Sequence, residues 1–281
     1  MTLSAFKSHF FQLLDGVHDR DELERFYFWL CEHFLALNRA EVVLSQQVEI
    51  QDETLLSLQP ALDQLKEGAP IQYVVGHAFF MGYKFQVNEH VLIPRPETEE
   101  LVSFITKQQL NKPVSILDIG TGSGCIAISL AKALPNAQVD ALDISEEALK
   151  VAVQNAGQLE AKVNFMHSDV LRLEQLPKNY DVIVSNPPYV KVSEKSQMHV
   201  NVLNFEPHTA LFVHDDDPLV FYRVIAELAW KNLVSGGMLY FEINQYLGKE
   251  TRELLEDLGY VQVQLLKDVF QNDRILVAQR P

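Results

Sequence analysis

The chain has 281 residues, of which 47% are hydrophobic and 22% are charged, and its formal net charge is −15. This composition is typical of a soluble globular protein with one large domain or two smaller ones. The acidic excess argues against a broad, sequence-independent grip on nucleic acid, because such a grip needs clustered Lys and Arg.

The cysteines and histidines form no pattern that would hold a metal. Cys31 and Cys125 lie far apart, and the nine histidines form no H-x-x-x-H or Cys/His cluster. We therefore expect two small apolar core residues in a reducing compartment, and no metal site. The chain opens without a signal peptide pattern and has no uninterrupted apolar stretch long enough for a bilayer, so we expect a cytoplasmic protein.

The region from residue 1 to about residue 68 is predicted to be helical. Asp21 followed by Glu24 fits a capping box at a helix start. An apolar stripe at three- and four-residue spacing follows it, made of Leu23, Phe26, Leu30, Phe34 and Leu37. In the next helical segment Pro60 is expected to begin a new helix or to make a kink. The region carries no polar constellation, and we predict a helical lid or docking domain over residues 1–70.

A β-hairpin is predicted next. The runs Tyr73–Phe80 and Tyr83–Val87 are rich in β-formers, and Met81-Gly82 lies between them. The segment PRPETE then opens a helix, with Glu97, Glu99 and Glu100 in its first turn, where acids oppose the helix dipole favourably. Spacing alone does not distinguish this segment from an ordinary exposed helix start.

Strands and helices alternate from Val114 onward. The expected strands are Ser115–Ile119, Gln138–Leu142, Val163–Met166, Asp181–Ser185, Met238–Ile243, Val261–Leu265 and Arg274–Gln279, and the expected helices are Cys125–Leu134, Ser145–Gln158, Pro218–Leu233 and Gly248–Leu258. This order predicts an α/β fold with a doubly wound, mainly parallel, seven-stranded sheet and helices on both faces. The last two strands have no long helix between them, so one is expected to pair antiparallel at the edge.

A glycine loop and an acid lie where such sheets bind ligands, beyond the carboxyl ends of the strands. The loop after the first of these strands is Gly120-Thr121-Gly122-Ser123-Gly124, whose glycines let the backbone approach a ligand closely. Asp143 follows the last of these glycines by 19 positions and ends the next strand. A carboxylate there can accept hydrogen bonds from both ribose hydroxyls of an adenosine.

Two cofactor classes share this arrangement. A dinucleotide fingerprint is G-x-G-x-x-G, whereas this loop has G-x-G-x-G with Asp118 just before it. Asp118 would repel a pyrophosphate but suits the ammonium group of S-adenosylmethionine. Asp169, beside Val170 at the end of a third strand, is placed to reach the adenine amino group. One glycine loop is a weak signal, but these features at successive strand ends are strong together.

The segment Asn186-Pro187-Pro188-Tyr189 follows a short buried strand. The two prolines fix φ and offer no N–H, so the backbone past the strand should be rigid. Asn186 would present a carbonyl and an NH2 group, and Tyr189 a flat face and a hydroxyl. This is a holder for a planar amide or amino group, although the tetrapeptide taken alone fits an ordinary stiff turn equally well.

Five segments resemble the HemK-like (PrmC-type) glutamine methyltransferases, which modify the GGQ glutamine of class I peptide-chain release factors. The segments are YVVGHAFFMGYKFQVNEHVLIPRPETEELV, DIGTGSGCIAISLA, SNPPYV, FEPHTAL and FYRVI. The similarity runs from about Ile71 to the C-terminus, and LIPRPETE together with NPPY is specific. The sequence PETE favours the release-factor branch over sister enzymes that act on a ribosomal-protein glutamine.

The resemblance implies a class I methyltransferase domain with its hairpin linker over residues 71–281, and a substrate-docking role for residues 1–70. It implies transfer of a methyl group from S-adenosylmethionine to the glutamine amide nitrogen of a factor that acts in translation termination. The expected cofactor contacts are Gly120, Thr121, Gly122, Ser123, Gly124, Asp143, Asp169, Val170 and Asn186, and the expected glutamine contacts are Asn186, Pro187, Pro188 and Tyr189.

The expected mechanism is positioning, because the motif offers no titratable base. The Asn186 side-chain oxygen and the Pro187 carbonyl would accept the two amide hydrogens, and Tyr189 would pack on the flat amide. Two departures from the family pattern concern the rim of the site. Asn244 replaces the Gly of E-I-G, and His214–Pro218 replaces G-x-D-G.

Three other interpretations remain open from the residues. A DNA adenine methyltransferase could also use NPPY, but it must flip out a base and hold a duplex, and the sequence has no basic patch for this. A ribosomal-protein glutamine methyltransferase is the second. A non-catalytic S-adenosylmethionine-binding adaptor is the third, and the intact Asn186, Pro187 and Asp143 count against it.

Overall fold

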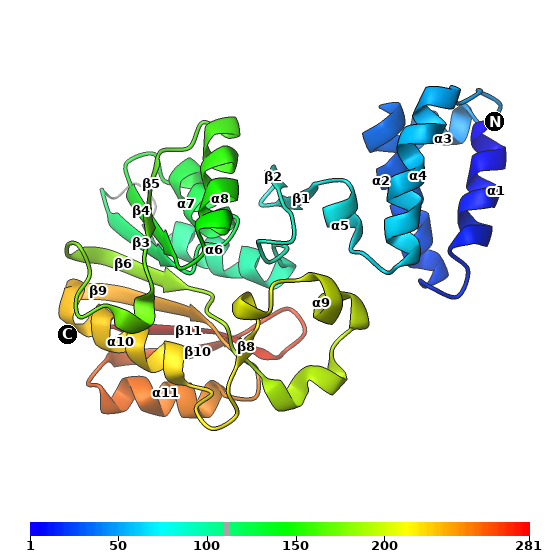
Figure 1. Cartoon of the computed structure of the whole chain (residues 1–281). Coiled ribbons are helices and arrows are strands. Elements are labelled where there is room, and N and C mark those ends of the chain that lie inside the picture. The colour runs from blue at the N-terminus through cyan, green and yellow to red at the C-terminus, as the bar shows by residue number, and fades with distance from the viewer. Residues whose placement is uncertain (110–112) are drawn as a thin grey trace. The chain divides into compact units, whose positions relative to one another are not determined.

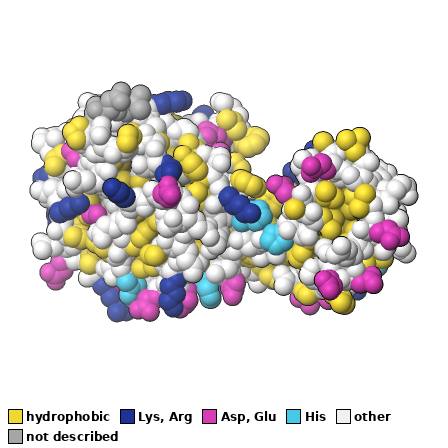
Figure 2. Space-filling model, turned by 90° about the horizontal axis from the view of Figure 1, so that it is seen from above, with side chains coloured by type: hydrophobic (Ala, Val, Ile, Leu, Met, Phe, Trp, Pro, Cys, Tyr) yellow, Lys and Arg dark blue, Asp and Glu magenta, His cyan; other side chains and the backbone are white. Residues whose placement is uncertain are grey.

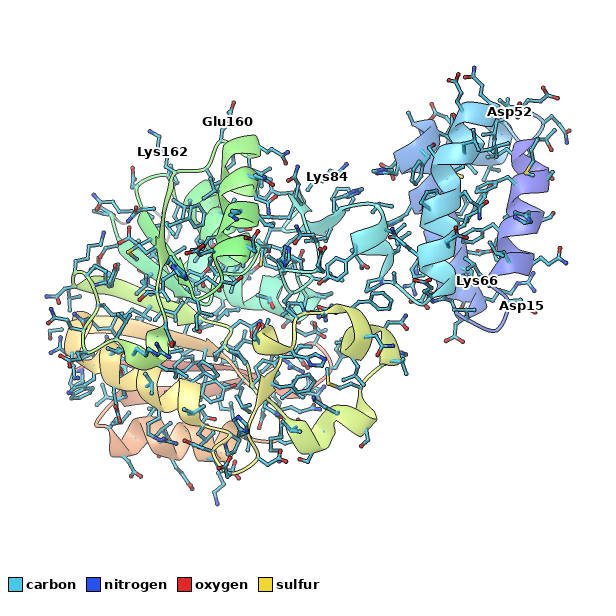
Figure 3. The ribbon with its side chains drawn as sticks, in the orientation of Figure 1. Asp15, Asp52, Lys66, Lys84, Glu160 and Lys162 are labelled. Atoms are coloured by element: carbon cyan, nitrogen blue, oxygen red, sulfur yellow. The ribbon has the colours of Figure 1, made fainter. Side chains whose placement is uncertain are left out.

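The computed structural model describes residues 1–109 and 113–281, which form two compact units (Figure 1). One unit contains residues 1–77 and 199–205, and the other contains residues 78–198 and 206–281. Charged side chains such as those of Asp52, Lys66 and Glu160 extend outward from the ribbon (Figure 3). Within the described ranges, no helix is both long enough and apolar enough to cross a membrane.

The first unit is helical. Its helices are α1 (Leu3–Leu13), α2 (Arg20–Leu35), α3 (Arg39–Leu44), α4 (Asp52–Lys66), α5 (Ile71–Val74) and α9 (Val200–Phe205). The core is rich in aromatic rings, with Phe6, Phe10 and Tyr27 almost fully buried and in mutual ring contact. Burial of a large apolar side chain stabilises a fold by about 1.5–3 kcal/mol, so these rings contribute strongly to this small unit.

Two details of these helices differ from the sequence prediction. Helix α2 begins after Asp19 without a side-chain cap, so the capping box predicted at Asp21 is wrong. The box occurs instead at α3, between Asn38 and Glu41. Helix α4 continues through Pro60 and no new helix begins there. Pro60 has no backbone N–H to donate to the carbonyl of Leu56. Because the Leu56 side chain is 74% exposed, water can supply the missing donor at this position.

The predicted hairpin forms, but its first strand is shorter than expected. Strand β1 is His77–Phe80 and β2 is Tyr83–Gln86, since the residues from Ile71 to Val74 form α5. Met81 and Gly82 both have positive φ, as a two-residue type I′ turn requires. The amide N of Met81 donates to Glu99 Oε1 at 2.6 Å, which fixes the hairpin to helix α6 (Pro96–Gln109).

The second unit contains a seven-stranded sheet in the order β10-β11-β9-β6-β3-β4-β5. The strands are β3 (Ser115–Ile119), β4 (Gln138–Asp143), β5 (Val163–His167), β6 (Tyr180–Ser185), β9 (Leu233–Glu242), β10 (Val261–Lys267) and β11 (Asp273–Gln279). Strands β5, β4, β3, β6 and β9 are parallel. The order reverses between β3 and β6, and this switch point is where doubly wound sheets bind ligands.

Helices cover both faces of the sheet (Figure 1). They are α6, α7 (Cys125–Ala133) and α8 (Glu146–Gln158) on one face, and α10 (Val220–Asn232) and α11 (Gly248–Asp257) on the other. Residues that alternate along a strand enter opposite cores, as Ile116 and Leu117 of β3 do. The central strands are therefore apolar on both faces, which explains their continuous apolar runs in the sequence.

Two features of the sheet correct the prediction. The antiparallel strand is β11, which lies between β9 and β10 and not at the edge. Strand β9 begins at Leu233 and not at the expected Met238, because α10 already ends at Asn232, and the next residues include Gly236 and Gly237. They lie within β9, where Gly236 has φ +79° and the pairing with β6 changes register. Only glycine accommodates such a left-handed position at low cost.

The connection from β6 to α10 consists of short elements. They are β7 (Val190–Lys191), η2 (Val192–Gln197), α9, η3 (His208–Ala210) and β8 (Phe212–Val213), and a further short helix, η1 (Val170–Arg172), follows β5. Strands β7 and β8 pair in parallel, and this pairing begins immediately after Tyr189. The chain beyond the NPPY segment is thus held in place by backbone hydrogen bonds.

Candidate active site

The glycine loop and the NPPY segment lie at the carboxyl ends of two neighbouring strands. The loop follows β3 and NPPY follows β6, and these strands pair with Ile119 opposite Ser185. The Ser185 hydroxyl donates to the carbonyl of Ile119 at 2.7 Å, which joins the two strand ends. The topology therefore brings together two motifs that are more than 60 residues apart in the sequence.

The glycine loop has an open part and a packed part. All three glycines have positive φ. A Cβ at Gly120 or Gly122 would meet no described heavy atom within 4 Å, so a ligand can approach the backbone there. A Cβ at Gly124 would lie only 2.8 Å from Ile128 Cδ1 and 3.2 Å from Ala152 Cβ. Gly124 is thus required for packing of α7, while the first two glycines leave space for a ligand.

Asp143 connects the glycine loop to the following helix. Its Oδ2 accepts from Gly122 N at 2.8 Å and its Oδ1 from Ser145 N at 2.9 Å. Burial raises the pKa of this carboxyl, and the two backbone donors oppose the rise. Each oxygen keeps a second acceptor position, so Asp143 can order the loop and still accept from ligand hydroxyls.

Asp118 is fully buried beneath the loop. The Thr121 hydroxyl donates to its Oδ2 at 2.6 Å, whereas Oδ1 has no hydrogen-bond partner among the residues that the structure describes. Burial raises the pKa of Asp118 to about 7, and the Thr121 bond lowers it in part. A cationic ligand group would give Oδ1 a partner and would lower this pKa again.

Asp169 and Val170 begin the short helix η1 after β5. Asp169 Oδ1 accepts from Leu171 N at 3.0 Å, and Oδ2 pairs with Arg172 Nε at 3.1 Å. Val170 is buried in the core on the α10 face. Asp169 therefore has a local structural role as a helix cap, and its carboxylate is largely occupied by these partners.

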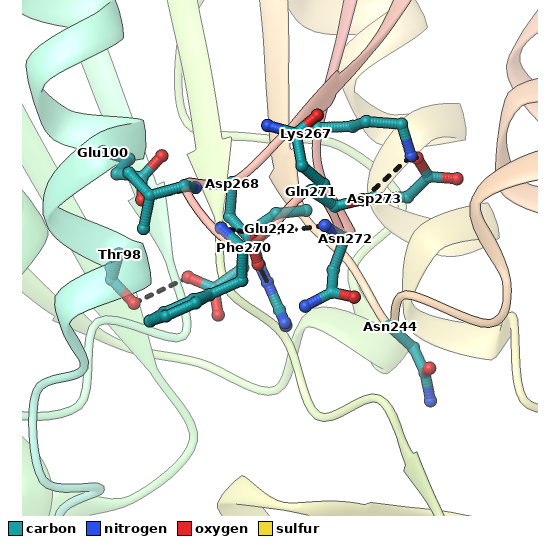
Figure 4. Close-up of polar contacts among 12 residues, drawn as sticks. Thr98, Glu100, Glu242, Asn244, Lys267, Asp268, Phe270, Gln271, Asn272 and Asp273 are labelled. Atoms are coloured by element: carbon teal, nitrogen blue, oxygen red, sulfur yellow. Dashed lines mark hydrogen bonds and ion pairs between the residues drawn. The ribbon is translucent and has the colours of Figure 1, made fainter.

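Asn186 is oriented by a buried hydroxyl–carboxylate pair. Its Nδ2 donates to Thr98 Oγ1 at 3.3 Å, and the Thr98 hydroxyl donates to Glu242 Oε2 at 2.6 Å (Figure 4). Thr98 and Glu242 are 2% and 1% exposed. The amide NH2 of Asn186 faces protein, which leaves its side-chain oxygen available as an acceptor.

Tyr189 is joined to the same carboxylate. Its hydroxyl donates to Glu242 Oε1 at 3.1 Å. Burial raises the pKa of Glu242, while the Thr98 bond and the nearby Arg274 charge lower it. Burial and the charge of Glu242 raise the pKa of Tyr189, so its phenol stays protonated. One carboxylate thus fixes both polar ends of the NPPY segment.

Asn244 holds the backbone of the motif. Its Nδ2 donates to the carbonyl of Tyr189 at 3.0 Å and to Glu194 Oε2 at 3.1 Å. The backbone N of Asn244 donates to the hydroxyl oxygen of Tyr222 at 3.2 Å. The departure from E-I-G therefore lies in direct contact with NPPY, and not merely on the rim of the site.

Glu206 fixes the segment that leads to Thr98. Its Oε2 accepts from Ile93 N at 3.2 Å, and its Oε1 pairs with the guanidinium of Arg95. Glu206 is 3% exposed, so the carboxylate is buried, as Ile93 is, whereas the Arg95 side chain is partly exposed. The segments LIPRPETE, NPPY and FEPHTAL are thus connected through this acid and Thr98.

Two family models match the chain. One is described as the PrmC N-terminal domain and matches residues 11–76, and the other as the methyltransferase small domain and matches residues 97–211. A release factor glutamine methyltransferase from Flavobacterium psychrophilum is 50% identical over 98% of this chain and 98% of its own. One from Bacteroides thetaiotaomicron is 45% identical over 96% and 97%.

The chain belongs to the release factor glutamine methyltransferase family. Its fold is also similar to that of a solved methyltransferase from Pyrococcus furiosus, with a TM-score of 0.53 and 20% identity over 71% of this chain and 90% of that one. The predicted class I methyltransferase fold is therefore confirmed.

Thr98 and Glu242 bond to Asn186 and Tyr189 of the candidate site, and the sequence analysis did not identify them. Thr98 lies inside PRPETE, which was interpreted as a helix start and as part of a family motif but with no role for this threonine, and Glu242 precedes the Asn244 departure. A polar residue at the end of a buried strand was the available signal for Glu242. No signal in the sequence pairs it with Thr98, because 144 positions separate them.

One cavity among the described residues lies away from these motifs. It has a volume of about 640 Å³ and is lined in part by Val114, Asp181 and Gly236. These residues lie at the amino ends of β3 and β6 and in the first half of β9. Ligands of doubly wound sheets bind at the opposite edge, so the fold gives no reason to place the reaction there.

Proposed function

We propose that this chain transfers a methyl group from S-adenosylmethionine to the side-chain amide nitrogen of the GGQ glutamine in class I peptide-chain release factors. The observation that carries the proposal is Asn186, which lies at the switch point beside the glycine loop, with its NH2 held by Thr98 and its side-chain oxygen bonded to no described residue. The names of relatives that match nearly the whole chain support the same substrate.

The residues around the glycine loop fit S-adenosylmethionine. Asp118 Oδ1 is a buried acceptor without a described partner, which suits the ammonium group of the cofactor. Asp143 would accept the ribose hydroxyls, and Gly120 to Gly124 would form the wall against which the cofactor lies. Asp169 and Val170 would lie near the adenine, with Asp169 contributing less because Leu171 N and Arg172 already occupy its oxygens.

The NPPY segment would hold the glutamine amide. The Asn186 oxygen and the Pro187 carbonyl accept its two hydrogens, and Tyr189 and Pro188 confine its flat faces. The bound cofactor supplies an activated methyl group, so alignment and exclusion of water are the contribution of the protein. None of these residues needs to act as a base before transfer, and one proton then passes from the methylated amide nitrogen to water.

The experiment that tests this function is incubation with a class I release factor and isotopically labelled S-adenosylmethionine, followed by mass mapping. One added methyl group on the GGQ glutamine is the expected result. A release factor in which this glutamine is replaced serves as the control. Label on another residue, or no label on the release factor when intact cofactor is present, would contradict the proposal.

A DNA substrate is disfavoured by charge. The chain carries 38 acidic against 23 basic residues. On the face shown in Figure 2, Lys and Arg side chains lie singly among acidic and neutral ones. Binding of duplex DNA needs clustered positive charge, so we expect no retention of DNA in a filter-binding assay.

Asp143→Ala is expected to weaken cofactor binding at least about tenfold. The variant loses the charged acceptor of the ribose hydroxyls and the partner of Gly122 N, and a hydrogen bond to a charged group is worth about 1.5–3 kcal/mol. Calorimetry measures the affinity directly. Asp169→Asn serves as a comparison and should weaken cofactor binding less, since the Asp169 carboxylate is occupied by local partners. Unchanged affinity in Asp143→Ala would remove it from the cofactor site.

Residues 1–70 are proposed to dock the protein substrate. Leu44 in α3 and Leu56 in α4 are 85% and 74% exposed, which is unusual for leucine. Truncation is a poor test, because residues 199–205 belong to the same unit and would lose their packing. The double variant Leu44→Ser and Leu56→Ser is expected to raise KM for release factor severalfold and to leave cofactor affinity unchanged. Equal KM values for variant and wild type would contradict this role.

A further inference from the structure

The turn between β10 and β11 exposes two apolar side chains. Val269 and Phe270 are both 72% exposed, and they are adjacent in the sequence. The turn spans Asp268 to Asn272, between the last residue of β10 and the first of β11. A large aromatic ring that is exposed to water does not stabilise the fold by burial. Such an exposed apolar side chain can therefore indicate a binding surface.

The turn is rigid despite this exposure. Asp268 is 2% exposed, and its Oδ1 accepts from Phe270 N and from Asn272 N, both at 2.9 Å. Its Oδ2 accepts from Arg274 Nε at 3.2 Å. The backbone N of Asp268 donates to the carbonyl of Asn272 at 2.9 Å, which closes the turn. The two apolar side chains are therefore presented on an ordered support and would lose little backbone entropy on binding.

The turn lies at the same edge of the sheet as Asn186. Strand β11 is antiparallel to both β9 and β10, so β10 runs parallel to β9 and β6 and ends at their carboxyl edge. Val269 N donates to Glu100 Oε1 at 3.3 Å, and Glu100 follows Thr98 by two positions in α6. Figure 4 shows the Phe270 ring directed from the turn towards the side of Thr98.

The turn is also connected to the carboxylate that fixes NPPY. Arg274 pairs with Asp268, and its carbonyl accepts from Ile243 N at 2.9 Å, next to Glu242. The positive charge of Arg274 acts on the pKa of Glu242 and of Tyr189. The turn thus continues the part of the edge formed by β6 and β9. The glycine loop and Asp143 belong to β3 and β4, on the other side of β6.

We propose that Val269 and Phe270 form a contact for the protein substrate, and that they bind an apolar patch on the segment that flanks the target glutamine. This inference rests on the proposed function. The glycine loop follows β3, Asp143 ends β4 and Asp169 follows β5, so these cofactor contacts lie across β6 from the turn, which is placed for the second reactant. A protein substrate must lay chain across this edge to bring a glutamine to Asn186, and an ordered apolar pair beside that path is suited to fix its register.

The test compares single variants of the intact protein with a matched control. Phe270→Ala is expected to raise KM for release factor about tenfold, and Val269→Ala about threefold, as truncation of apolar anchors does at interfaces. Turnover at saturation and cofactor affinity should stay unchanged. Phe270→Leu keeps an apolar side chain, so its KM for release factor should lie close to that of wild type. Val153→Ala, which truncates a valine 53% exposed on α8, is the control and should change nothing.

Direct binding of release factor, measured by calorimetry without turnover, separates this inference from the proposed function. If wild type binds release factor without methylating it, the proposed function fails, and the binding constants of Phe270→Ala and Phe270→Leu still decide the role of the turn. Equal KM and binding constants for Phe270→Ala and wild type would overturn the inference. A loss of cofactor affinity, an equal effect of Val153→Ala, or no binding by wild type would overturn it too.

Discussion

Asn186→Ala is expected to lower the turnover number about a hundredfold or more while the protein stays folded and binds its cofactor. The variant removes the acceptor oxygen that aims the glutamine amide, and misplacement of a reacting group by about 1 Å can cost a factor of 10². Asn186 is partly exposed and its only described side-chain bond is to Thr98, so its removal should cost little stability.

Asn186→Asp should reduce turnover sharply too, although it keeps an acceptor oxygen. A carboxylate cannot donate to Thr98 Oγ1, whose proton is already given to Glu242, so two oxygens would face each other at 3.3 Å. The added negative charge also favours the positively charged cofactor over a transition state in which that charge is being consumed. Cofactor affinity should therefore be kept or increased.

Single-turnover methylation of release factor by Asn186→Ala, Asn186→Asp and Tyr189→Phe distinguishes these effects. Tyr189→Phe should be the mildest, because the flat ring is retained and only the bond to Glu242 Oε1 is lost. Transfer at the wild-type rate by Asn186→Ala would mean that NPPY is only a stiff turn and that the glutamine is positioned elsewhere.

Thr98→Val is expected to lower turnover about tenfold to a hundredfold with little change in either substrate affinity. Valine has a similar shape but breaks the chain from Asn186 to Glu242. The lost bond to a charged acceptor is worth about 1.5–3 kcal/mol. If the whole amount is added to the activation free energy, the rate falls by about one to two factors of ten. Thr251→Val is the matched control, since Thr251 is also buried but bonds to the carbonyl of Leu247, just before α11.

Glu242→Gln extends this prediction to pH. Both oxygens of Glu242 accept from hydroxyls, so the ionised form fits the network. Its pKa is raised by burial, and protonation as the pH falls would therefore break the network at a higher pH than for a free glutamate. The turnover of wild type should fall with decreasing pH, beginning at a higher pH than the titration of an ordinary glutamate would give.

A pH profile of turnover at saturating substrates checks the role of Glu242. Glu242→Gln should be slow at every pH and should lack the acid limb, because an amide NH2 cannot accept from Thr98 or Tyr189 and cannot titrate. An identical acid limb in wild type and Glu242→Gln would assign the titration to another group. Unchanged turnover in Thr98→Val would show that Asn186 does not need this support.

The sequence alone determined the order of elements in the methyltransferase fold, since that information is local. Ser145, the first residue of the expected helix Ser145–Gln158, caps α8, and its hydroxyl accepts from Ala148 N at 3.1 Å. Gly120 to Gly124 follow β3, and Asp143 ends β4, because apolar runs, glycines and caps act over a few residues. The placement of these motifs at strand ends was enough to predict one ligand edge.

Long-range pairing was decided only by the tertiary structure. The insertion of β11 between β9 and β10 depends on which strand edges are free, and the interruption at Gly236 depends on register with β6. The link from Asn186 through Thr98 to Glu242 joins α6, β6 and β9, none of which carries a local signal for the others. Hydrogen-bond partners of buried side chains are chosen by the packed fold, so a sequence pattern could identify the amide holder but not the residues that orient it.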